Sequence, residues 1–61
     1  MRTYEVNLYD PMTGATSAID TIKAPEGYTA EDYIRDCKAN ADDAWNEMLE
    51  NGEVSLMEVE G

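Results

Sequence analysis

The strict alternation of side chains in residues 3–9, TYEVNLY, constrains the fold of this chain more than any other feature. In an extended chain, Tyr4, Val6 and Leu8 point to one side, and the residues between them point to the other. A period of two is typical of a β-strand with one buried face. Because this run is the cleanest in the sequence, we expect it to form the central strand of a sheet.

Residues 16–23 predict a second strand with a less regular pattern. Ala18 and Ile22 share one face, whereas Ile19 lies on the other. Such a mismatch indicates an edge strand with a β-bulge. The intervening residues 10–14, DPMTG, predict a tight turn between the two strands.

Residues 53–60, EVSLMEVE, predict the last strand of the sheet. Its apolar residues divide between two faces, with Val54 and Leu56 on one and Met57 and Val59 on the other. Either pair could therefore share the outer face of the sheet with Glu5, Asn7 and Tyr9 of the first strand.

A long helix is predicted for residues 30–50. Thr29 and Asp32 resemble a capping box at its start, and Gly52 is expected at its C-terminal end as the stop. A helix of this length would span about 31 Å. Apolar residues recur at spacings of three and four along one face. They are Ala30, Tyr33, Ile34, Cys37, Ala41, Ala44, Trp45, Met48 and Leu49.

The order of these elements, β-β-α-β, determines the expected topology. A helix after the second strand returns the chain so that the third strand runs antiparallel to the first. We therefore predict a single α+β domain over residues 1–61, with a three-stranded antiparallel sheet in order 2-1-3. One long helix would pack on one face of this sheet, and the other face would be open.

The composition argues against catalysis and against bound groups. The chain has no histidine, which is the commonest general base and a frequent metal ligand. It has no glycine-rich phosphate loop, and Cys37 falls on the apolar face of the predicted helix. We therefore predict no enzyme activity, no catalytic residue, no cofactor and no metal site.

The same sequence favours a cytoplasmic protein. A single cysteine cannot form an internal disulfide, and no signal-peptide pattern opens the chain. No apolar run approaches the roughly 20 residues that a membrane span needs. We expect no contact with membranes.

The negative charge is concentrated in the second half of the chain. The net charge is −10, and residues 26–61 carry eleven of the 14 acidic residues but only two of the four basic ones. A surface of this kind repels nucleic acid and attracts basic protein surfaces. Direct binding of nucleic acid, which needs lysine and arginine, is therefore not expected.

Part of this charge would form a stripe along the outer face of the predicted helix. Neighbouring carboxylates on a helix are unfavourable by about 0.2–0.5 kcal/mol per pair, so the stripe needs a reason. It could simply be a solvated face that keeps a small protein soluble. Alternatively, its carboxylates are candidates for partner binding. The stripe consists of Asp32, Asp36, Asp43, Glu47 and Glu50, with Asp42 and Glu53 supporting it.

Carboxylates one helical turn apart are about 6 Å from each other, a spacing similar to that of phosphates along a nucleic-acid strand. In its small size, its charge and this stripe, the chain resembles phage-encoded DNA-mimic inhibitors of the anti-CRISPR and anti-restriction type. That resemblance implies a compact, non-enzymatic protein in the host cytoplasm that blocks a basic, nucleic-acid-binding groove of a protein target. A break in residues 30–50, or neutralisation of the stripe by arginine and lysine, would argue against it.

A different function would use the open sheet face. Tyr9 and Met57 would be exposed on this face, which could bind a partner or a second copy of the chain. In this alternative the protein is a structural or regulatory interaction module, as a monomer or a homodimer.

Overall fold

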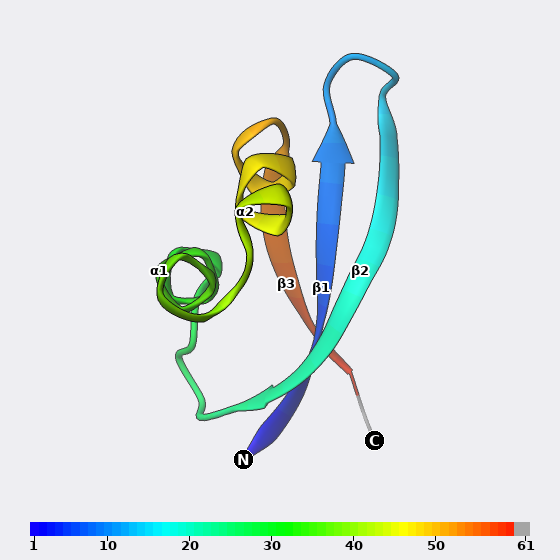
Figure 1. The fold of residues 1–61 in the computed structure, drawn as a ribbon. Helices are drawn as coiled ribbons and strands as arrows, with labels where there is room; N and C mark the ends of the chain where they lie inside the picture. The colour runs from blue at the N-terminus through cyan, green and yellow to red at the C-terminus, as the bar shows by residue number, and fades with distance from the viewer. Residues whose placement is uncertain (60–61) are drawn as a thin grey trace.

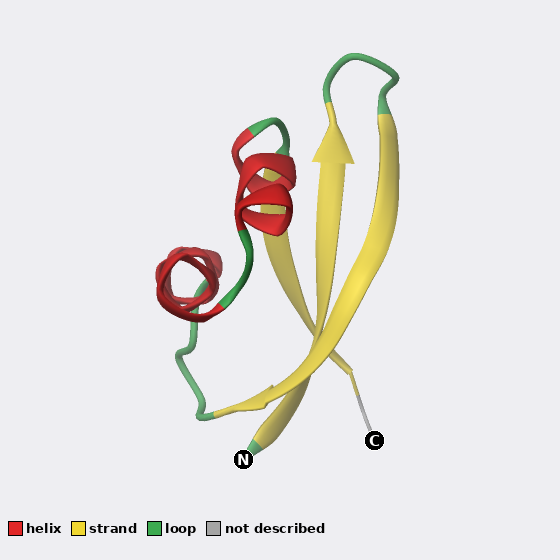
Figure 2. Cartoon of the chain, viewed as in Figure 1, coloured by secondary structure: helices red, strands yellow, loops and turns green. Residues whose placement is uncertain are grey.

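A computed structural model describes residues 1–59. The chain forms a three-stranded antiparallel sheet in the order β2-β1-β3, and two helices lie against one face of this sheet (Figures 1 and 2). The predicted α+β class and strand order are therefore confirmed. Glu60, the last residue of the predicted third strand, lies outside the described residues. The elements are β1 (Arg2–Asp10), β2 (Ala15–Ala24), α1 (Ala30–Asn40), α2 (Asp43–Glu50) and β3 (Glu53–Val59).

β1 is the central strand, as its alternation predicts. Val6 is fully buried and Tyr4 nearly so, both on the side of the helices. β1 pairs with β2 along its whole length, and it pairs with β3 from Thr3 to Tyr9. The strand with the most regular pattern thus has a neighbour on each side.

The predicted bulge lies in β2, and it explains the irregular pattern of that strand. Val6 pairs with Asp20 and Asn7 pairs with Ala18, so Ile19 is the extra residue. Ile19 is half-buried and packs on the core together with Ile22. The expectation that Ala18 and Ile22 share a face is therefore wrong, because the bulge shifts the register between them.

The prediction of one long helix over residues 30–50 is wrong, because the segment is divided into α1 and α2. Ala41 and Asp42 both have extended backbone conformations, with ψ angles of 167° and 168°. The Asp42 side chain accepts a hydrogen bond from the Trp45 backbone N–H at 2.8 Å and so caps α2. Asn40 donates to the Asp36 carbonyl oxygen at 3.1 Å. Asparagine and aspartate compete with helical hydrogen bonds in this way, which favours a helix boundary.

The core is small, and each helix contributes one buried side chain to it. Tyr33 of α1 and Leu49 of α2 are buried and pack with Val6 of β1. Half-buried residues surround this cluster, including Leu8, Trp45, Met48, Val54 and Leu56. The Tyr33 hydroxyl also donates to the Asp20 carboxylate at 3.1 Å, which ties α1 to β2. Neither helix in residues 1–59 is long and apolar enough to cross a membrane.

Gly52 follows α2 as predicted, but its role differs from the expected one. The helix is capped by Asn51, and the glycines with a positive φ are Gly14 and Gly27. A Cβ atom on Gly52 would lie 2.6 Å from the Tyr9 carbonyl oxygen. Glycine is therefore needed here because the chain passes close to β1, and not because the helix ends in a left-handed turn.

Candidate functional site

The carboxylates of α1 take part in the local structure of the protein. Asp32 accepts a hydrogen bond from the Thr29 backbone N–H at 3.0 Å, and its own N–H donates to the Thr29 hydroxyl at 3.3 Å. This is the predicted capping box. The hydrogen bonds from Thr29, followed by the nearby Arg35 guanidinium, lower the pKa of Asp32. Arg35 lies 3.2 Å from the Asp32 carboxylate, so the charge at this end of α1 is partly neutralised.

Asp36 is also engaged within the protein. It accepts a hydrogen bond from the Tyr28 hydroxyl at 2.5 Å, and Arg35 lies 3.7 Å from its carboxylate. Burial of Tyr28 and its hydrogen bond to Asp36 raise the pKa of Tyr28 to about 12. Asp36 therefore connects α1 to the loop before it.

The outward carboxylates of α2 have a different environment. Asp43, Glu47 and Glu50, hereafter the α2 carboxylates, are all exposed. Their spacings of four and three place them on the helix face opposite the buried Leu49. Within residues 1–59, none of these three side chains forms a hydrogen bond or an ion pair. They are directed to solvent.

The predicted stripe is therefore divided into two groups with different roles. Asp32 and Asp36 belong to α1 and have partners, whereas the α2 carboxylates lie beyond the break. Asp42 caps α2, and Glu53 lies in β3 opposite Tyr9 of β1. The expectation of one uninterrupted acidic rod is wrong. An acidic segment remains at residues 42–53, which contain five acidic residues and no basic one.

None of the ion pairs within the described residues involves an acidic residue of α2. Arg2 pairs with Glu58 and lies 3.6 Å from Glu26, both at the end of the sheet near the N-terminus. Arg35 pairs with carboxylates of its own helix. The three α2 carboxylates therefore give the surface around this helix a negative potential.

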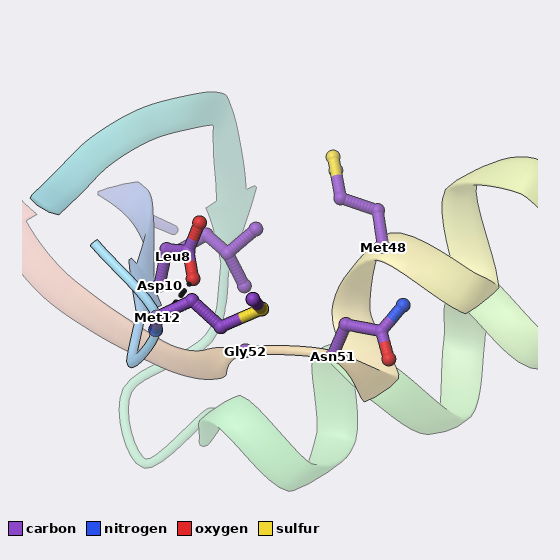
Figure 3. Close-up of a pocket in the computed structure, with 6 residues that line it drawn as sticks. All are labelled: Leu8, Asp10, Met12, Met48, Asn51 and Gly52. Carbon is purple, nitrogen blue, oxygen red and sulfur yellow. Dashed lines mark hydrogen bonds between the residues drawn. The ribbon is translucent and has the colours of Figure 1, made fainter. Parts of the chain in front are cut away.

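A pocket lies beside α2, where the β1–β2 turn meets the connection to β3 (Figure 3). Its volume is about 450 Å³. It is lined by Leu8, Asp10, Met12, Met48, Asn51 and Gly52. Sequence reasoning missed this pocket because its walls come from two stretches far apart in the sequence, residues 8–12 and 48–52. Met12 lies in the turn between β1 and β2 and is 94% exposed.

The open sheet face carries a mixture of polar and apolar residues. Glu5 pairs with Met57, and Thr3 pairs with Val59. The open face therefore carries Met57 and Val59, and Val54 and Leu56 lie on the other face. Met57 is 53% exposed and Tyr9 is 39% exposed. Neither helix covers this side of the sheet (Figure 2).

Nothing in residues 1–59 brings three or more potential metal ligands together. Cys37 is half-buried and packs against the core, as its place on the apolar face predicts. No protein-family model, no curated protein and no solved structure matches the chain. The features of the described chain that bear on function are the α2 carboxylates, the adjacent pocket and the open sheet face.

Proposed function

We propose that the protein is a non-catalytic acidic inhibitor that binds a basic, nucleic-acid-binding groove of a protein target. The α2 carboxylates carry the contact, and Asp42 holds the start of the helix. Glu53 pairs with Tyr9 on the open sheet face, so it lies outside this contact. The observation that supports this proposal is the lack of internal partners for Asp43, Glu47 and Glu50 within residues 1–59. A charged group without an internal partner keeps its full capacity to attract a basic surface.

The break between α1 and α2 argues against mimicry of nucleic acid by one rod over residues 30–50, and it limits the proposed contact to α2. A rod of about 31 Å would have followed a groove over several phosphates, but α2 has eight residues and spans about 12 Å. Asp32 and Asp36 are already engaged with Thr29, Tyr28 and Arg35, so they contribute little to the contact. The α2 carboxylates would thus replace only two or three phosphates, and shape complementarity must supply the rest of the affinity.

A salt-controlled capture experiment tests this function. The protein is immobilised, exposed to a host lysate at about 50 mM NaCl, and eluted at increasing salt. Screening by salt weakens contacts between exposed charges, so we expect the specific target to elute well below about 1 M NaCl. Added DNA or RNA should compete with the immobilised protein for this target.

A matched pair of charge reversals locates the contact. Glu47→Lys with Glu50→Lys should abolish capture, because it inverts the α2 surface. Glu26→Lys with Glu31→Lys changes the net charge equally at exposed positions outside α2 and should retain capture. If both variants lost capture of the target equally, binding would depend on the total charge and not on α2. Full capture by the Glu47→Lys, Glu50→Lys variant would refute the proposal.

The open sheet face supports a second candidate function, an interaction module that acts as a monomer or a homodimer. The supporting observation is the exposure of Met57 and Tyr9 on an uncovered face. Burial of apolar surface is weakly sensitive to salt, so a complex of this kind would resist elution at 1 M NaCl. Met57→Glu should disrupt it, whereas Glu47→Lys with Glu50→Lys should not. Sedimentation velocity of both variants would distinguish the two functions.

A further inference from the structure

We propose that the pocket beside α2 binds the side chain of one lysine or arginine of the protein partner. This inference rests on the proposed function and specifies how a basic surface would be anchored. The pocket is apolar at its centre and acidic at one wall. That combination fits a long aliphatic chain that ends in a cation.

The apolar part of the pocket comes from Leu8, Met12 and Met48. Leu8 and Met12 lie on one wall with Asp10, and Met48 and Asn51 lie on the facing wall (Figure 3). The methylene groups of lysine and arginine cover apolar surface readily while the charged end stays near water. Methionine side chains are flexible, so two of the three apolar residues can adjust to a side chain between them.

Among residues 1–59, Asp10 is the one charged residue that lines the pocket. Its Oδ1 atom accepts a hydrogen bond from the Met12 backbone N–H at 2.9 Å, which fixes the orientation of the carboxylate. A carboxylate has acceptor sites on both oxygens, so Oδ2 remains able to accept from an ammonium or guanidinium group. An anionic ligand would be repelled by Asp10 and by the adjacent α2 carboxylates.

The position of the pocket links it to the proposed interface. Met48 and Asn51, which line the pocket, directly follow Glu47 and Glu50 in the sequence. A basic surface that meets the α2 carboxylates would therefore lie next to the pocket. Gly52 forms part of the wall, where the chain passes close to Tyr9 and Leu8.

The test uses small probes with the intact protein, followed by two-dimensional ¹H–¹⁵N NMR. The probe is n-butylguanidinium, which has both an aliphatic chain and a cation. n-Pentanol tests the chain alone, and guanidinium at equal concentration tests the cation alone. We expect n-butylguanidinium to bind more tightly than either control, with the largest shifts at the amides of Met12, Asn51 and Gly52.

Asp10→Asn is the decisive variant, because asparagine retains an oxygen that can accept from Met12 while the charge is lost. Loss of one exposed charge contact should weaken n-butylguanidinium binding about two- to fivefold. Glu31→Gln removes the same charge from an exposed position on α1 and should leave the affinity unchanged. Circular dichroism of both variants verifies that the fold is intact.

Three results would overturn the inference. They are equal binding of n-pentanol, equal affinity of the Asp10→Asn and Glu31→Gln variants, and the absence of localised shifts. The proposed function has its own separate test in the capture experiment with the Glu47→Lys and Glu50→Lys variant. Capture without probe binding would refute only the pocket, and probe binding without capture would refute only the inhibitor function.

Discussion

The two helices carry similar acidic residues but use them differently. In α1, Asp32 completes the capping box and Asp36 accepts a hydrogen bond from Tyr28. In α2, Glu47 and Glu50 face solvent without an internal partner among residues 1–59. Asp32 and Asp36 of α1 therefore stabilise the fold, whereas the outward acidic residues of α2 remain accessible to another molecule.

The basic residues account for much of this difference. Arg35 and Lys38 both belong to α1, and Arg35 pairs with two carboxylates of that helix. α2 contains no basic residue, and within residues 1–59 its acidic side chains have no hydrogen-bond or ion-pair partner. Asp42, which precedes α2, caps the helix through Trp45. α2 is held in place through its buried face, because no side-chain hydrogen bond or ion pair links it to the sheet within residues 1–59.

The largest expected effect concerns the attachment of α2. Leu49 is 3% exposed and packs with Val6 and Tyr33. Leu49→Ala should lower the free energy of unfolding by about 2–5 kcal/mol, since it leaves a cavity in the core. The total stability of so small a domain is about 3–5 kcal/mol, so the variant should be largely unfolded. Urea denaturation followed by Trp45 fluorescence would measure this.

Met57→Ala provides the control for that variant, because it removes a large side chain from the open sheet face. An exposed position should change the free energy of unfolding by less than about 0.5 kcal/mol. If Leu49→Ala and Met57→Ala lowered the free energy of unfolding equally, the buried contact of Leu49 would not be what holds α2 on the sheet.

The caps of the two helices should have effects of similar size. Thr29→Ala removes the hydroxyl that caps α1, and Asp42→Ala removes the carboxylate that caps α2. Each should cost about 1 kcal/mol, which lowers the melting temperature by about 4–8 °C in a domain of this size. Asp43→Ala, one residue after the cap, should have a much smaller effect. If Asp43→Ala were as harmful as Asp42→Ala, the boundary between the helices would lie elsewhere.

The sequence predicts the sheet well because strand pairing depends on alternation. The period of two in β1 identifies the central strand, and the mismatch in β2 identifies the bulge. The order of the elements then leaves few topologies to choose from. The two faces of β3 could not be separated in advance, since both carry two apolar residues and only the register with β1 decides between them.

The helix break was harder to predict, because the apolar spacing of three and four continues across it. Asn40 and Asp42 were the available signals, since both residue types favour helix ends. The pocket could not be predicted from local pattern at all. It forms only when Leu8, Met12 and Met48 are brought together from segments far apart in the chain.

Tyr28→Phe tests the structural role of Asp36 in α1, because it removes the hydroxyl that donates to this carboxylate. The substitution should lower the free energy of unfolding by about 0.5–1 kcal/mol at neutral pH. The pKa of Tyr28 is raised from 10.0 to about 12 in the folded protein. The folded state therefore holds this proton more strongly, and the stabilisation present below pH 10 is lost as the pH rises to about 12. Urea denaturation across this range should show a steeper loss in the unmodified protein than in the variant. Parallel curves would exclude a contribution from this hydroxyl.

The smallest expected effect has the opposite sign and concerns α2. Glu47→Gln with Glu50→Gln removes like-charge contacts, including that between Glu47 and Asp43, and relieves negative charge near the C-terminal end of the helix. We expect the free energy of unfolding to rise by about 0.5 kcal/mol in low salt, and the gain to shrink as salt screens the charges. Asp32→Asn with Asp36→Asn changes the net charge equally but should destabilise the protein, because those carboxylates have internal partners. Thermal denaturation of both variants at two salt concentrations compares the helices directly. If both lost stability, the α2 carboxylates would have a structural role, and their exposure would no longer argue for a partner.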